Sequence, residues 1–393
     1  MKFSLIISFF LISAACTVTA ESQEFSITYF SENINFNFDK SSLPDYDIRF
    51  DEWFVKRFYS KLERSDLNRL ASEIVHFQEV YNLNGWLTYG LIEKMINEIV
   101  IEKPTNYKRL LIWFLLNKTG YDARLAHYEE AYFVQVYTKD DLYEIPYFEI
   151  DNRIFINISA VKGSKSSYQN KSLEFYLIEF RPNPTGKSLS FDLNQIPIFK
   201  PIIINQSIQF WIKGRPQKLT VNLDKNIIDL MNNYPIVAEN EYVFRELSQT
   251  LHSSLITQLR TRIEGMTQKE SVQYLLALTR SGFRYKEDIE NFGYNRPMIA
   301  DEVFYYSSSD CEDRSALFFN LAKELLDLPM IIVSYPDHLT IGIKLDINEG
   351  KPLYYKGEKY TICDPTGPSN SSDIGIYPKG YERKAYEVIG AYK

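Results

Sequence analysis

Apolar residues recur at intervals of three and four along the first third of the chain. One such stretch begins behind Ser65 and Asp66, a second covers about 87 to 100, and a third, YKRLLIWFLLNKTG, ends at Gly120. Because this spacing collects apolar side chains on one helical face, it predicts three helices, the first capped by Ser65 or Asp66. The runs YFVQVYT, YFEI and RIFINIS then predict strands, and together these elements indicate an α+β domain over residues 21–168.

Short β-rich runs separated by proline and glycine fill the middle of the chain. SLEFYLIEF, SLSFDL, IIINQSIQFWIKG and KLTVNL follow one another there, which is typical of a separate β-rich module, placed here at 169–235. Helical periodicity then returns, and Thr267 with Glu270 three residues later has the form of a capping box. We therefore expect a third unit over 236–393 and an α+β fold class for the chain as a whole.

The first twenty residues, 1–20, have the pattern of a secretory signal. Lys2 supplies a positive charge, a short apolar run follows, and small residues precede a cleavage position after Ala20. Cys16 would suit lipid attachment, but Ser13 stands where lipoprotein signals usually carry leucine, so we favour simple cleavage. The sequence thus predicts an exported protein, located in the periplasm, at the cell surface or outside the cell.

Composition narrows the classes of partner. Aromatic residues make up 15% of the chain, which argues against disorder. The net charge is −7 and no basic run stands out, so we expect neither nucleic acid nor an anionic membrane surface as a partner. No stretch reaches the length of a transmembrane helix, so we expect no integral membrane span. Beyond the signal only Cys311 and Cys363 remain, enough for one disulfide at most.

Cys311 lies where the polar run SSSD turns into the apolar helical pattern CEDRSALFFNLAKELL. Ser309 or Asp310 suits the cap of a helix that begins at the cysteine. The positive end of the helix dipole favours a thiolate there. The acidic neighbours, including Glu312 and Asp313, would raise the thiol pKa if they faced the sulfur. These opposing effects do not decide whether Cys311 is a nucleophile, and a cationic imidazole partner would help to settle it.

His338 and Asp364 stand at the ends of two predicted strands downstream of the cysteine. His338 opens HLTIGIKL, and Asp364 closes KYTICD just before a proline. Alternation along the second strand turns Cys363 away from the face that carries Asp364. A helix bearing a cysteine, followed by strands bearing a histidine and an aspartate, can assemble a nucleophile, a base and an orienting carboxylate. We predict Cys311, His338 and Asp364 as catalytic residues.

These residues and their surroundings resemble the transglutaminase-like superfamily over about residues 246 to 377. In that papain-like fold a Cys opens a helix, a His starts a strand and an Asp-Pro closes the next, and DCEDR and CDPTG are similar to the bacterial branch. Ser309 and Thr340 replace the glycine and the aromatic residue that are common there. The resemblance implies a peptide or protein substrate, attack on amide bonds, and hydrolysis in preference to cross-linking.

Other roles for the cysteine stay open at this point. Cys311 could be a buried structural thiol or half of a disulfide with Cys363. Zinc held by the three predicted catalytic residues is disfavoured because no close ligand pair such as CxxC is present, so we expect no metal and no other cofactor. The backbone N–H of Cys311 is one candidate oxyanion donor, with Tyr305 or Tyr306 as the second.

An earlier stretch repeats the order helix, strand, strand. When Arg109 is aligned with Arg314, Asn106 aligns with Cys311, and LLIWFLL aligns with SALFFNL. On this alignment the N-terminal domain would be a degenerate copy with a binding or scaffolding role, although apolar helices readily produce such similarity. The leading prediction is an exported thiol enzyme that acts on peptide or protein amides. The alternative is a non-catalytic envelope module that binds protein or glycan.

Overall fold

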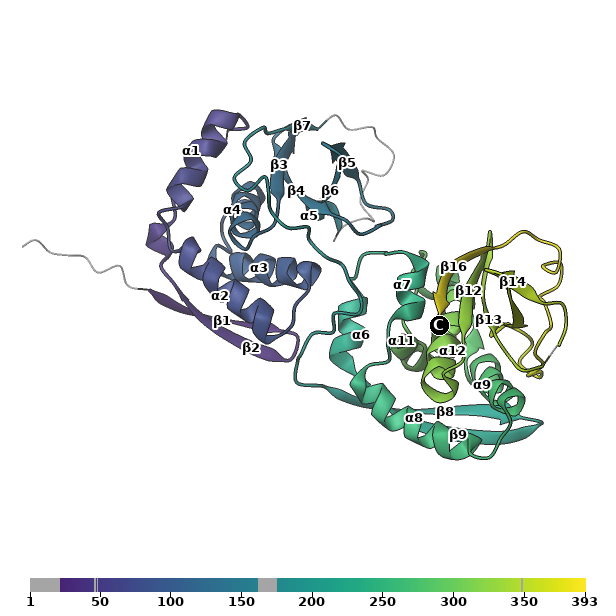
Figure 1. Ribbon diagram of the computed structural model, residues 1–393. Helices are drawn as coiled ribbons and strands as arrows, with labels where there is room; N and C mark the ends of the chain where they lie inside the picture. Colours follow the sequence, from purple (N-terminus) through teal and green to yellow (C-terminus); the bar gives the residue numbers. More distant parts are fainter. Residues whose placement is uncertain (1–21, 46, 48, 162–174, 348) are drawn as a thin grey trace, which may run out of the picture.

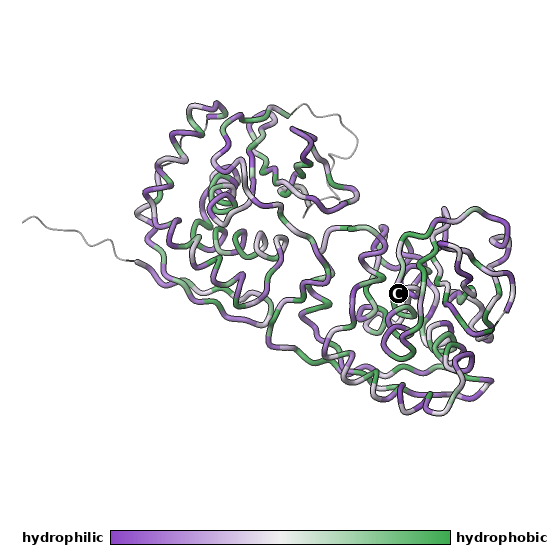
Figure 2. Tube along the Cα trace, in the orientation of Figure 1, coloured by the Kyte–Doolittle hydropathy of each residue, from purple (hydrophilic) through white to green (hydrophobic). Residues whose placement is uncertain are grey.

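The computed structural model describes residues 22–45, 47, 49–161, 175–347 and 349–393. The chain forms two groups of helices and strands, one up to about residue 199 and one beyond it, and each group has an α+β architecture (Figure 1). Apolar and polar positions alternate along both groups (Figure 2). Of the helices in the described ranges, none has the length and apolar character needed to cross a bilayer. The predicted signal and Cys16 lie outside the described residues.

The N-terminal half confirms the three predicted helices and adds a hairpin and a further helix before them. Its strands β3 to β7 form one antiparallel sheet in the order β5-β6-β4-β3-β7. The elements of this half are β1 (Gln23–Tyr29), β2 (Glu32–Phe38), η1 (Lys40–Ser42), α1 (Glu52–Leu62), α2 (Leu67–Val80), α3 (Gly85–Ile99), α4 (Thr105–Lys118), β3 (Ala123–Tyr128), β4 (Ala131–Thr138), β5 (Tyr147–Ile150), β6 (Arg153–Asn157), α5 (Ile158–Val161) and β7 (Tyr176–Leu177).

The C-terminal half has a second sheet, in the order β14-β15-β13-β12-β16, and its helix α9 begins with the predicted capping box of Thr267 and Glu270. The elements of this half are β8 (Ile203–Ile212), β9 (Arg215–Asp224), α6 (Lys225–Met231), α7 (Glu239–Phe244), α8 (Gln249–Ile263), α9 (Gln268–Gly282), β10 (Arg284–Tyr285), α10 (Asp288–Phe292), α11 (Ala300–Tyr306), β11 (Ser308–Ser309), α12 (Cys311–Leu326), β12 (Met330–Tyr335), β13 (His338–Ile343), β14 (Leu353–Tyr355), β15 (Glu358–Cys363) and β16 (Glu387–Tyr392).

The two halves share one order of elements. Each begins with an antiparallel hairpin, β1–β2 or β8–β9, and continues through helices to one largely buried helix, α4 or α12. Four strands follow that helix, and the first two of them form an antiparallel hairpin. A last strand then returns to pair with the first. If the strands of each sheet are numbered from the first strand after the buried helix, the two sheets have the same strand order.

The buried helix of each half is held by side-chain hydrogen bonds as well as by apolar packing. In α4, Trp113 is fully buried, and its Nε1 donates to the carbonyl of Ala123, which opens β3, at 3.0 Å. Asn117 donates to the same carbonyl at 3.0 Å. In α12, Asn320 donates to the carbonyl of Val243 in α7 at 3.0 Å. A buried amide that finds such partners fixes the position of the helix it stands on.

The segment predicted as a separate β-rich module, 169–235, does not form a core of its own in its described residues. Its first part contributes Leu189 and Phe191 to the apolar core of the N-terminal half. The hairpin β8–β9 contributes Phe210 and Leu219 to the core of the C-terminal half, where it lies against α8 and α9. A two-stranded hairpin is only marginally stable alone, so it is stabilised by packing on these helices.

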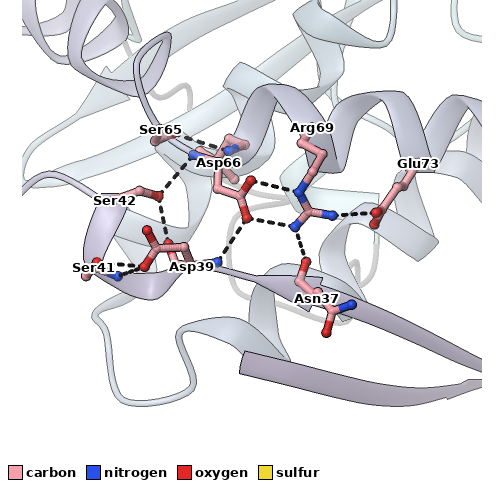
Figure 3. Close-up of polar contacts among 9 residues, drawn as sticks. Asn37, Asp39, Ser41, Ser42, Ser65, Asp66, Arg69 and Glu73 are labelled. Carbon is pink, nitrogen blue, oxygen red and sulfur yellow. Dashed lines mark hydrogen bonds and ion pairs between the residues drawn. The ribbon is translucent and has the colours of Figure 1, made fainter. Parts of the chain in front are cut away.

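A polar network joins the end of the first hairpin to the start of α2 (Figure 3). Of the two predicted capping residues, Asp66 directly precedes α2, but its side chain makes no capping bond to the helix. It accepts instead from the backbone N–H of Asp39 at 2.9 Å and pairs with Arg69 at 2.7 Å. Ser65 supplies the local contact to the helix, by accepting from the N–H of Leu67 at 3.3 Å. The carboxylate thus stabilises tertiary structure rather than the helix end.

Candidate active site

Cys311 is the first residue of α12, as the sequence pattern predicts. Asp310 is the cap, and its carboxylate accepts from the N–H of Asp313 at 3.4 Å. The carboxylate of Asp313 accepts in return from the N–H of Asp310 at 3.1 Å, which completes a capping box. Cys311 is 7% exposed, so the thiol lies at a helix N-terminus near, but not open on, the surface.

His338 and Asp364 meet across the C-terminal sheet. Strands β13 and β15 are antiparallel neighbours in which Ile341 pairs with Cys363, so the start of one strand lies beside the end of the other. His338 Nε2 lies 3.0 Å from Asp364 Oδ1, and the two side chains are only 9% and 5% exposed. The ring of Tyr381 packs edge-on against the imidazole at 5.2 Å between centroids. With Nε2 donating to the carboxylate, Nδ1 is the ring nitrogen left for a second partner.

Helix α12 lies against the beginning of β13, which brings the cysteine next to the histidine strand. Ser315 Oγ, one turn after Cys311, donates to the carbonyl of Leu339 at 3.0 Å. The thiol itself donates to Glu312 Oε2 at 3.0 Å. The described contacts include none between the Cys311 sulfur and the His338 ring. The structure therefore joins His338 to Asp364 and places Cys311 beside the same strand, with its thiol turned to Glu312.

The surroundings of the sulfur favour the neutral thiol in this arrangement. Burial raises the pKa of Cys311 above its ordinary value, and the carboxylates of Glu312 and Asp310 raise it further. A hydrogen bond from the backbone N–H of Leu339 acts in the opposite direction and lowers the pKa. Of the acidic neighbours, Glu312 and Asp310 thus act on the cysteine, so a thiolate requires a cationic partner.

Three buried carboxyl groups lie behind the cysteine. Asp288, Asp310 and Asp313 each offer an oxygen atom, and these atoms lie within 4.8 Å of one another. Burial is the main cause that raises the pKa of each, to about 6 for Asp288. Carboxylate oxygens are the ligands that hard divalent cations prefer, so among the described residues this group could hold such an ion. The three predicted catalytic residues do not form a comparably close group.

Two arginines shape the site without entering the predicted set. Arg314, on α12, donates to Ser309 Oγ at 3.1 Å and to the carbonyl of Phe283 at 2.7 Å, so it holds the helix against its surroundings. Arg280, on α9, donates through Nε to the carbonyl of Asp364 at 2.9 Å. Arg280 was not singled out by the sequence, because it lies in an ordinary helical pattern far from the three motifs.

Of the two tyrosines suggested as oxyanion donors, Tyr305 packs against the apolar core of the C-terminal half, and Tyr306 has a side-chain partner for its hydroxyl. Tyr306 donates its hydroxyl to Asn232 Oδ1 at 2.8 Å, so the proton of that hydroxyl already has an acceptor. Tyr285, which the sequence did not single out, is drawn beside α12 because β10 pairs with β11, with Tyr285 opposite Ser309. Burial raises the pKa of Tyr285, and its hydrogen bond to Glu287 and the nearby carboxylates of Glu287 and Asp310 add to this effect. Tyr285 therefore lies close enough to line the site.

Cys363 is a core thiol. It is fully buried in the apolar core of the C-terminal half, where it lies with Ile341. Both Cys311 and Cys363 are free, so the structure does not contain the disulfide considered as an alternative. Strand alternation turns Cys363 to the opposite side of the sheet from Asp364, as the sequence pattern predicts.

Searches against protein-family models, curated proteins and solved structures found no match to this chain. The assignment of a function to the site therefore depends on the residues and their geometry.

Proposed function

We propose that the C-terminal half is a transglutaminase-like thiol enzyme that hydrolyses amide bonds of peptides or proteins outside the cytoplasm. The observation that carries the proposal is the buried His338–Asp364 pair, 3.0 Å apart, beside the helix that begins with Cys311. A buried carboxylate that fixes one imidazole nitrogen leaves the other free to exchange a proton with a nucleophile. The preference for hydrolysis over cross-linking follows from the resemblance to bacterial relatives.

The proposed reaction begins with rotation of the thiol from Glu312 toward the imidazole. His338 takes the thiol proton as the Cys311 sulfur bonds to the substrate carbonyl carbon. The imidazolium, held by Asp364, then gives that proton to the leaving nitrogen as the carbon–nitrogen bond breaks. Water next attacks the thioester carbon and passes a proton to His338. The carbon–sulfur bond breaks, the acid leaves, and the proton returns to the cysteine.

Trapping of the acyl-enzyme tests this proposal. Wild-type protein is incubated with a mixed peptide library, quenched in acid and digested, and acyl adducts are located by mass spectrometry. We expect a thioester on Cys311 and new carboxyl termini in the library, both abolished in Cys311→Ala. The buried Cys363→Ala is the matched control and keeps both. A variant without Cys311 that cleaves as fast as the wild type, or a wild type that neither cleaves nor acylates, contradicts the proposal.

We also infer that the N-terminal half is a second, catalytically silent copy of the same fold. The shared order of elements supports this inference. In the first turn of α4, Asn106 accepts from the N–H of Tyr132 at 3.0 Å and donates to the carbonyl of Glu130 at 2.7 Å. Cys311 has a similar place in α12, beside the N–H of Leu339 in the matching strand. An amide thus stands where the other half has its thiol.

The remaining positions of the silent copy fit the same inference. Strand β4 opens with Ala131, where β13 opens with His338. The hydroxyl of Tyr132 donates to the carbonyl of Arg49, and the Phe50 ring packs on Tyr132 at 4.8 Å between centroids. The segment that contains Arg49 and Phe50 therefore covers the start of β4. We expect Asn106→Ala to lower the unfolding temperature and to leave acylation of Cys311 unchanged. Loss of acylation without loss of stability would contradict a silent role.

A further inference from the structure

Arg280 is a buried cation beneath the loop that carries Asp364. It lies in the last turn of α9 and is 2% exposed. Its Nε and Nη2 donate to the carbonyl of Asp364 at 2.9 and 2.5 Å. Its Nη1 donates to the carbonyl of Ser371 at 3.0 Å, and Nη2 also reaches the carbonyl of Asp373 at 3.2 Å. One planar guanidinium therefore holds both ends of the loop 364–373.

The charge of Arg280 has no direct carboxylate partner. Among the described residues it makes no ion pair, and its hydrogen bonds go to backbone carbonyls. Burial lowers its pKa, while the carboxylates of Asp364 and Asp373 raise it. A buried cation without a partner is costly, and the structure offsets the cost with carbonyl dipoles and with the Asp364 carboxylate nearby.

Close packing ties the loop to the guanidinium. Gly367 lies against it so tightly that a Cβ at this position would come within 2.8 Å of Arg280 Cζ. Within the same turn, the N–H of Thr366 donates to Asp364 Oδ1 at 3.3 Å, the oxygen that also contacts His338. Any shift of the loop therefore moves the carboxylate relative to the imidazole.

We propose that Arg280 is a positioning residue that holds Asp364 against His338 by clamping the loop 364–373. This inference rests on the proposed function, because its effect is measured on the thiol chemistry of Cys311. Arg280 touches neither the substrate nor the sulfur, and it acts through the backbone of Asp364. A displacement of about 1 Å in such an arrangement commonly costs a catalyst about 100-fold in rate.

A cavity gives experimental access to the clamp. About 480 Å³ of open space lies beside α9 and the loop, lined in part by Ala277, Ser281 and Ser371. Ser371 supplies one of the carbonyls that Arg280 binds, so the cavity extends to the edge of the clamp. Free guanidinium, far below its denaturing concentration, can therefore be tested as a replacement for the missing side chain.

The experiment compares turnover of a library peptide by wild type, Arg280→Lys, Arg280→Ala and Gly367→Ala, with circular dichroism to verify folding. We expect kcat to fall about 100-fold in the two Arg280 variants with KM within about threefold, and guanidinium to restore part of the Arg280→Ala loss. Gly367→Ala perturbs the same loop but keeps the charge of Arg280, and we expect kcat to fall in this variant as well. Arg260→Met, an exposed arginine on α8, is the control and keeps the wild-type kcat.

Three outcomes overturn the inference: an unchanged kcat in Arg280→Lys and Arg280→Ala, a change in KM alone, or no response of Arg280→Ala to guanidinium. If Arg280→Ala fails to fold, the inference is tested by the kcat of Gly367→Ala. A wild-type kcat in Gly367→Ala also overturns the inference. These outcomes differ from failure of the proposed function, in which the wild type itself neither cleaves the peptide nor acylates Cys311.

Discussion

Replacing Glu312 by glutamine tests how the acidic neighbours control the cysteine. The Cys311 thiol donates to Glu312 Oε2 at 3.0 Å, and this carboxylate is among the causes that raise the thiol pKa. Glutamine keeps the size and an acceptor oxygen but removes the charge. The thiolate should therefore form at a lower pH in Glu312→Gln than in the wild type.

The distance sets the size of the effect. Two unit charges about 4 Å apart interact by about 1 kcal/mol in water and about 4 kcal/mol near a protein surface. Glu312 is half-buried, so the interaction lies between these limits. Since one pKa unit corresponds to about 1.4 kcal/mol, we expect Glu312→Gln to lower the pKa of Cys311 by about one to three.

The assay is the rate of iodoacetamide alkylation at Cys311 as a function of pH, read by mass spectrometry of the Cys311 peptide. Cys363 is fully buried and serves as an internal reference that reports any unfolding. Glu324→Gln removes another carboxylate from the same helix, one that contacts His252 rather than the thiol, and should leave the profile unchanged. If the midpoint of the alkylation profile in Glu312→Gln lies at the same pH as in the wild type, or at a higher pH, the electrostatic reasoning is refuted.

Three further predictions concern the fold. Gly342→Val should cost about 1–3 kcal/mol in urea unfolding, because its Cβ would lie 2.8 Å from Ile331 Cγ1. Thr267→Ala should cost about 1 kcal/mol by the same assay, since it breaks the capping box with Glu270. Burial raises the pKa of Asp288 from 3.8 to about 6, so its carboxyl favours folding below pH 3.8 and loses this contribution as the pH rises through 6. The difference in stability between Asp288→Asn and the wild type should therefore shift in favour of the variant by about 1–3 kcal/mol from pH 4 to pH 8. The same difference at both pH values would contradict this prediction.

Local patterns account for most of what the sequence predicted. The capped start of α12 at Cys311 follows from polar residues that precede an apolar helical repeat. Strand alternation places Leu339 and Ile341 in the core of the C-terminal half and leaves His338 and Asp364 to meet on the other side. These features depend on neighbours within one or two elements, so periodicity alone is sufficient to find them.

The remaining features depend on contacts between distant segments. Arg280 reaches the carbonyl of Asp364 across 84 residues of sequence, and nothing in its own helix marks it out. Asp66 has the form of a helix cap, but a better partner is available in Arg69 and in the N–H of Asp39. The direction of the Cys311 thiol depends on a rotamer, which residue type and spacing do not determine.

The catalytic claim depends most directly on His338, because burial and the carboxylates beside Cys311 oppose ionisation of its thiol. The decisive measurement is labelling of Cys311 by an electrophilic thiol probe near pH 7 in the wild type and in His338→Ala, both in a Cys363→Ala background. We predict that the wild type reacts faster than a free thiol and that His338→Ala loses at least about tenfold in rate. Equal labelling of the two folded proteins would contradict the role of His338 as the base that activates Cys311.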